Sequence, residues 1–149
     1  MDNSLVLTPV GVVHSPVHES RIMPVQGVRG QIEIFPEFVP ALEGVETSSH
    51  LILLAWMHRG ERDLLTARAR KISEDLPLKG VFSLRSPSRP NPLSVSVVRL
   101  LCRKEGGILE VDSLDCIEGT PVIDIKPYQP GGDCVFSATH HDRSVKIEK

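Results

Sequence analysis

The chain has 149 residues and a formal net charge of −2, which favours one domain over residues 1–149 and does not by itself require a nucleic-acid partner. Its three cysteines are odd in number and lack metal-ligand spacing, so we expect reduced thiols of a cytosolic protein and no bound metal. No secretory signal is visible, and the longest apolar run, residues 51–57, is too short to cross a membrane, which predicts a soluble, cytoplasmic protein.

The first half of the chain contains short apolar segments separated by glycine and proline. Residues 7–14 are β-like, and residues 31–35 alternate between polar and apolar side chains, as half-buried strands do. Residues 36–45 predict a short helix. Residues 51–57 are apolar on both faces and predict a central strand that is covered on both sides.

The second half repeats this pattern, with Gly106-Gly107 as a hairpin turn. The further predicted strands are residues 80–84, 94–101, 108–111 and 122–126. Many short strands with turn signals predict a mainly β fold, a small β-barrel or sandwich with short helical connections. The charged residues from about 139 to 149 predict a tail that frays.

Residues 61–76 fit two interpretations. Their apolar side chains recur at helical spacing, whereas residues 65–70 also alternate as a strand would. Periodicity alone favours the helix.

The proline-rich segment Arg85-Ser86-Pro87-Ser88-Arg89-Pro90-Asn91-Pro92 is the most informative stretch of the chain. Proline fixes φ and restricts the residue before it, so this segment is neither a regular helix nor a central strand. It predicts a stiff loop that holds two guanidinium groups and an amide in set directions. Such loops often carry binding or catalytic groups, although an inert turn is the alternative.

Polar groups follow or precede several predicted strands. They occur at residues 24–26, at His58-Arg59, in the proline-rich loop, and from residue 114 to residue 128. A pocket at these strand ends would suit a small, polar, partly charged ligand. Each group also has a structural interpretation: His58 as a hydrogen-bonding residue, residues 118–121 as a turn, and Asp124 with Lys126 as a surface ion pair. The motifs of common hydrolases, P-loop proteins and dinucleotide-binding folds are absent from the sequence.

Several motifs together resemble one family. They are Gly11-Val12-Val13-His14-Ser15-Pro16, residues 30–36, residues 49–58, Gly80-Val81-Phe82, the proline-rich loop, and residues 119–128. On these motifs the chain is similar to the TsaA-like family, also called YaeB or TrmO, over about residues 7–133.

The resemblance implies a small β-barrel, usually a homodimer, that binds S-adenosylmethionine. It further implies methylation of N6 of threonylcarbamoyladenosine next to the anticodon of tRNA. It favours a strand over residues 66–71. The implied cofactor-binding residues are Pro24, Val25, Gln26, His58, Arg59, Arg85, Val95, Cys116, Ile117, Glu118 and Gly119.

Three positions depart from the family pattern. Val25 replaces a common Arg, Ser94 replaces a Gly after Asn-Pro, and Glu118 replaces the Asp before Gly-Thr-Pro. These changes bear on the acceptor more than on the cofactor. An S-adenosylmethionine-binding protein, or a methyltransferase acting on a non-tRNA acceptor, is therefore the alternative function. A β domain that only binds a partner is a third.

Methyl transfer from a sulfonium requires the acceptor and the methyl group to be held in line. Arg85 or Arg59 could bind the methionine carboxylate, and Glu118 with the carbonyls of its turn could face the sulfonium. Candidate bases for the acceptor nitrogen are Asp124, His58 and Tyr128. Candidate substrate-binding residues are Arg89, Asn91 and Lys126, together with Lys79 for phosphate contacts.

Overall fold

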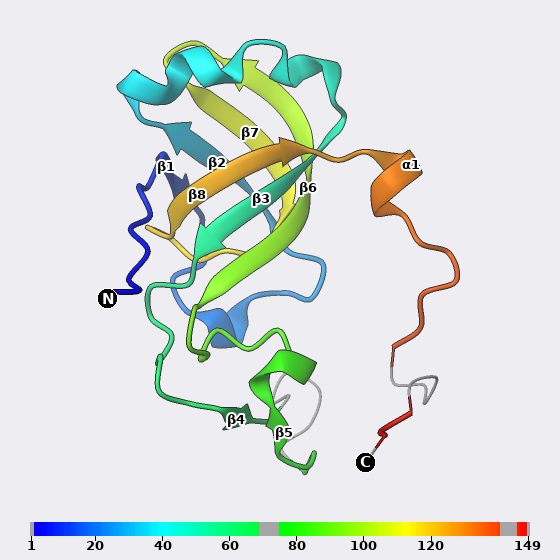
Figure 1. Ribbon diagram of the computed structural model, residues 1–149. Helices are drawn as coiled ribbons and strands as arrows, with labels where there is room; N and C mark the ends of the chain where they lie inside the picture. Colours follow the sequence, from blue (N-terminus) through cyan, green and yellow to red (C-terminus); the bar gives the residue numbers. More distant parts are fainter. Residues whose placement is uncertain (1, 69–74, 141–145, 149) are drawn as a thin grey trace.

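The computed structural model describes residues 2–68, 75–140 and 146–148. Six antiparallel strands close into a barrel in the order β1-β2-β7-β6-β3-β8 (Figure 1). They are β1 (Gly11–His14), β2 (Val28–Ile34), β3 (His50–Trp56), β6 (Leu93–Lys104), β7 (Ile108–Leu114) and β8 (Pro121–Pro127). The predicted fold class, a mainly β small barrel, is confirmed.

The remaining elements are short. The 3-10 helices are η1 (Ser20–Ile22), η2 (Pro36–Leu42), η3 (Val45–Thr47) and η4 (Val81–Ser83); β4 (Thr66–Ala67) pairs with β5 (Lys79–Gly80), and α1 (Pro130–Asp133) follows β8. The helix predicted over residues 36–45 is thus present as two 3-10 turns, η2 and η3, with Gly44 in the left-handed conformation directly before η3. Figure 1 shows these turns over the top of the barrel and β4-β5 below it.

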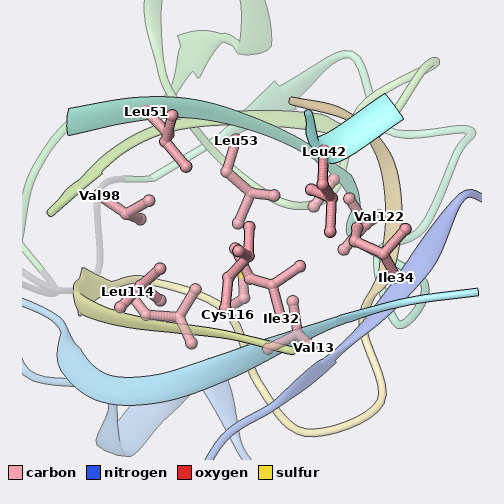
Figure 2. Close-up of a cluster of buried hydrophobic side chains, with 13 residues drawn as sticks. Val13, Ile32, Ile34, Leu42, Leu51, Leu53, Val98, Leu114, Cys116 and Val122 are labelled. Carbon is pink, nitrogen blue, oxygen red and sulfur yellow. The ribbon is translucent and has the colours of Figure 1, made fainter. Parts of the chain in front are cut away.

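The core lies inside the barrel and is almost entirely aliphatic (Figure 2). Every strand contributes alternate side chains, because successive residues of a strand point to opposite faces. Val13, Ile32, Leu53 and Val111 are fully buried there, and Leu42 of η2 closes the top.

The central strand β3 differs from its prediction. Leu51, Leu53 and Ala55 point into the core, but the opposite face is only half-buried rather than covered. On that outer face Ile52, Leu54 and Trp56 lie opposite Val97, Val95 and Leu93 of β6. The sequence could not reveal this, because an apolar outer face has the same pattern as a covered strand.

The pairing between β6 and β7 stops partway along β6. It runs from Lys104 back to Arg99, which lies opposite Asp112. Ser113 then adopts a φ of 62°, unusual for a residue other than glycine, and Leu114 pairs with Val28 of β2. As a result, the first half of β6 pairs with β3 on one edge and with no strand of the described chain on the other.

The connection between β3 and β6 corrects two predictions. Thr66 and Ala67 are extended and pair with Gly80 and Lys79, so the helix favoured for residues 61–76 is wrong there and the strand implied by the family is right. Residues 69–74 lie outside the described part. The strand predicted over residues 80–84 ends at Gly80, where η4 begins.

Replacing Leu53 with Ala tests the core. Leu53 is fully buried at the centre of the barrel, so its truncation leaves a cavity and should lower the free energy of unfolding by about 2–5 kcal/mol. Leu65→Ala is the control. Leu65 is 68% exposed, so its truncation should change the free energy of unfolding by less than about 0.5 kcal/mol. Chemical denaturation measures both, and equal effects would contradict this placement of the core.

Candidate functional site

One end of the barrel, the lower end in Figure 1, gathers three connections; we call it the loop end. Strands β1, β3 and β7 finish there, and β2, β6 and β8 start there. The connections are residues 15–27, 57–92 and 115–120. All the predicted cofactor-binding residues lie in these connections or, for Val95, near the start of β6.

Contacts between the connections hold this end together. Arg59 donates from Nη1 to the carbonyl oxygen of His18 (2.9 Å), and the N–H of Glu118 donates to Val17 (2.8 Å). The turn at residues 24–26 packs on the end of β7, because a Cβ added to Gly27 would lie 2.6 Å from the carbonyl carbon of Ser113. The three connections are therefore in direct contact.

Glu118 is fixed by its neighbours in β1. One carboxylate oxygen accepts the N–H of Ser15 (2.7 Å), and the other lies 3.2 Å from Nδ1 of His14. The Ser15 hydrogen bond chiefly lowers the pKa of Glu118. Both oxygens of Glu118 are thus engaged, which leaves the carbonyl groups of the turn as the acceptors available for a cation.

His14 joins this turn to β2. Its Nε2 lies 2.5 Å from Oε2 of Glu33, and this hydrogen bond, opposed by partial burial and reinforced by Glu118, raises the pKa of His14. When it is protonated, the imidazole donates to both carboxylates at once. We had not predicted His14 and Glu33 as site residues; they are diagonal neighbours across β1 and β2, which only the strand register reveals.

Cys116 and Ser94 lie inside the loop end. Cys116 is buried, and burial raises the pKa of its thiol to about 12. Ser94 hydrogen-bonds with this thiol, and its Oγ also lies 3.4 Å from the carbonyl oxygen of Ala55. Cys116 is therefore a neutral packing residue, and the side chain of Ser94, which departs from the family pattern, faces inward.

The unpaired edge of β6 faces away from β3. Leu100 donates its N–H to Ser49 and Pro92 accepts from Met57, so the even-numbered residues of β6 direct their backbone groups towards β3. Because these directions alternate along a strand, Val95 and Val97 direct theirs to the open edge, whereas the N–H of Leu93 donates to Asn91 (2.7 Å). Such a row of backbone donors and acceptors can pair with a polar planar ligand or an extended chain.

The proline-rich loop is braced from within. Arg89 donates to the carbonyl oxygens of Leu84 (2.8 Å) and Ser86 (3.4 Å), and its own N–H donates to Glu61 (2.9 Å). Asn91 accepts from Arg62 (3.3 Å). Arg89 and Asn91, which we predicted as substrate-binding residues, therefore have structural partners in this chain.

Arg85, the first residue of that loop, is exposed, and so is His58. Arg85 forms no ion pair with another described residue. Partial burial, and then the charge of Arg59, lower the pKa of His58. Near neutral pH its imidazole is uncharged and able to accept a proton.

The three candidate bases do not meet within one chain. His58 follows the end of β3, whereas the N–H of Tyr128 donates to His50 at the beginning of that strand, about 20 Å away at ~3.3 Å per residue. Asp124 lies on the outer face opposite Leu54, in an ion pair of 2.9 Å with Lys126. His58 is the candidate at the loop end.

A shallow hollow occurs at the opposite end of the barrel, beside Val39 of η2 and beside Arg103 and Gly107 of the β6-β7 hairpin. In the part of the chain that the structure describes, no three His, Cys, Asp or Glu side chains lie close enough to hold a metal ion, and no helix is long and apolar enough to cross a membrane.

The chain is similar to known proteins over most of its length. The profile of the tRNA-methyltransferase O N-terminal domain matches residues 12–134. A probable S-adenosyl-L-methionine-binding protein of Pyrococcus abyssi is 42% identical over 130 residues, which cover 84% of this chain and 68% of that protein. The tRNA (adenine(37)-N6)-methyltransferase of Escherichia coli is 35% identical over 151 residues, covering 92% and 63%.

A crystal structure of TrmO superposes with a TM-score of 0.75 and 36% identity, covering 93% of this chain. The chain belongs to the family of TrmO N-terminal domains, as its motifs predicted. It spans 61% of that solved chain, whereas it spans 92% of a probable S-adenosyl-L-methionine-binding protein of Methanothermobacter thermautotrophicus, to which it is 43% identical.

The pairing of His14 with two carboxylates gives a prediction about pH. Because the pKa of His14 is higher in the folded chain, its stabilising effect is complete below its unfolded-state pKa of 6.5 and is lost as pH rises through the folded-state value. Between about pH 6 and 9, the midpoint temperature of thermal unfolding should therefore fall more for the natural chain than for His14→Gln. The side chain is 43% exposed, so the effect is small. Parallel pH profiles would rule out the charged pairing.

Proposed function

We propose that this chain is an S-adenosylmethionine-dependent methyltransferase that acts on N6 of threonylcarbamoyladenosine next to the anticodon of tRNA. The observation that carries the proposal is the open edge of β6 at the loop end, where the family's motif residues gather. The family membership and the name of the Escherichia coli relative support the reaction.

The residues present fit this cofactor in three respects. The open edge at Val95 offers backbone groups for the adenine, and exposed Arg85 can bind the methionine carboxylate. Carbonyl groups of Cys116 and Glu118 can face the positive sulfur, since the Glu118 carboxylate is engaged by Ser15 and His14 and the Ile117 carbonyl accepts from Thr120. The cofactor supplies an electrophilic methyl group, and the chain supplies position and water exclusion.

His58 is the base in this proposal. The acceptor nitrogen gains a methyl group and must lose its proton, and the neutral imidazole of His58 can take it. The sulfonium becomes a neutral thioether as the methyl leaves. Asp124 is occupied by Lys126, and Tyr128 lies at the other end of β3.

An S-adenosylmethionine-binding protein, or a methyltransferase with a non-tRNA acceptor, is the second candidate function. Val25, in a position where the family commonly has Arg, is 90% exposed and lies in a loop at the loop end. An apolar side chain there offers an acceptor no charge. Several relatives are named only as S-adenosyl-L-methionine-binding proteins.

A homodimer forms part of the proposal. The outer face of β3 and β6 carries an apolar strip of Ile52, Leu54, Trp56, Leu93, Val95 and Val97. Leu93, Val95 and Val97 are 41–45% exposed, and Asp124 and Lys126 lie beside the strip with opposite charges. A surface with both signs can be complementary to its own copy across a twofold axis. A second copy would also enclose a site that is open in one chain.

The base is tested by His58→Gln. Transfer of labelled methyl groups to tRNA that lacks this modification should fall about 10²- to 10⁴-fold, because a general base contributes that much. Calorimetric affinity for S-adenosylmethionine should change little. Asp124→Asn is the matched control and should retain near-native transfer. Native transfer by His58→Gln would remove His58 as the base, and transfer to no tRNA would favour the second candidate function.

The dimer is tested by Val97→Lys, which places a charge in the apolar strip. The molar mass from light scattering should fall from that of a dimer to that of a monomer, since an unpaired charge is costly to bury. Leu65→Lys introduces the same charge at an exposed site in the β3-β6 connection and should leave the mass unchanged. A natural chain that is monomeric at all concentrations would refute the dimer.

A further inference from the structure

Charge is unevenly distributed along this chain. Residues 59–68 and 75–89, which we call the arm, contain six Lys and Arg and three Asp and Glu, a net charge of +3. The rest of the chain has a net charge of −5. The arm comprises most of the connection between β3 and β6, and Figure 1 shows its β4-β5 pair projecting below the barrel.

In the described part of the arm, several basic side chains contact neutral groups or are exposed. Arg59 and Arg62 donate to neutral carbonyl oxygens of His18 and Pro90. Lys79 and Arg68 are exposed, and Arg68 donates to the carbonyl oxygen of Leu76 (3.0 Å). In the described ranges, the ion pairs involve residues outside the arm.

Phe82 lies between Lys79 and Arg85 in the sequence. It is 86% exposed, although its neighbour Val81 is buried and donates its N–H to Leu65. The buried Val81 therefore anchors η4, and Phe82 projects from it into solvent. An aromatic ring that is so exposed adds nothing to the described core, and its face is open to stacking by a ligand.

We propose that the arm is a docking surface for a single-stranded RNA loop, in which Phe82 stacks on an unpaired base while Lys79 and Arg68 bind flanking phosphates. Single-stranded loops expose the faces of their bases, and aromatic rings between cations bind them with little dependence on sequence. The positive arm on an acidic chain favours a polyanion over an apolar protein partner. This inference rests on the proposed function, since an anticodon lies in such a loop.

The probe is a labelled RNA hairpin with an anticodon-type loop, and the measurement is fluorescence anisotropy. Phe82→Leu keeps an apolar side chain but removes the ring, so affinity should fall about five- to one-hundred-fold. Phe82→Trp should restore it. Leu65→Ala, which removes another exposed apolar side chain from the arm, should have no effect. A fully paired duplex should not distinguish Phe82→Leu from the natural chain.

The phosphate contacts are tested by salt. Lys79→Gln and Arg68→Gln should each reduce the slope of log affinity against log salt by about 0.7, the value for one lost contact with a single strand. Lys104→Gln is the control, because Lys104 lies at the hairpin end of β6 in an ion pair with Glu110. Unchanged slopes in the arm variants would overturn the phosphate contacts.

Three outcomes would overturn the docking surface: no binding of the hairpin by the natural chain, equal binding by Phe82→Leu, or a change in molar mass of that variant in place of a change in RNA affinity. The last would assign Phe82 to a protein interface. Methyl transfer to tRNA with RNA binding indifferent to Phe82 would reject the arm alone. Hairpin binding lost in Phe82→Leu, without any methyl transfer by the natural chain, would reject the proposed function alone.

Discussion

A closed barrel satisfies its backbone hydrogen bonds by pairing each strand on both edges, and β6 departs from this rule. From Leu93 to Val98 it pairs with β3 alone, because β7 turns away at Ser113 to follow β2. This split opens the wall next to the turn of residues 115–120. The same departure therefore exposes polar backbone of β6 at the loop end, where the family's motif residues lie.

The turn of residues 115–120 beside this opening is held by electrostatics. Glu118 accepts from Ser15 and contacts His14, which also bonds with Glu33 on β2. One charged imidazole thus links the turn to two strands of the barrel wall. These contacts fix the turn and its carbonyl groups before any ligand binds. Such pre-organisation lowers the entropy cost of binding.

Much of the fold could be predicted because alternation and turn residues are local signals. Residues 31–34, 94–101 and 122–126 lie in strands, and the Gly106-Gly107 hairpin is present. The loop end could be anticipated because its motifs stand at strand ends. Periodicity failed between residues 61 and 68, where a short pairing with Lys79 and Gly80 decides the conformation.

Other features depend on contacts between distant segments and have no local signal. The outer face of β3 looked covered because it is apolar, and Arg89 looked free for a substrate because its carbonyl partners are backbone atoms. Asp124 and Tyr128 lie within the family motif of residues 119–128, yet β8 places them away from His58. Composition likewise could not reveal that Phe82 faces solvent beside a buried Val81.

The connection between β3 and β6 joins two strands that are already hydrogen-bonded neighbours over seven residue pairs. Its ends meet where the N–H of Met57 donates to Pro92, so the whole segment is a long hairpin loop. The entropy of closing such a loop changes slowly with its length. Evolution can therefore lengthen, shorten or exchange this segment while the barrel keeps its register, and recognition of the acceptor can diverge among relatives that share one cofactor platform.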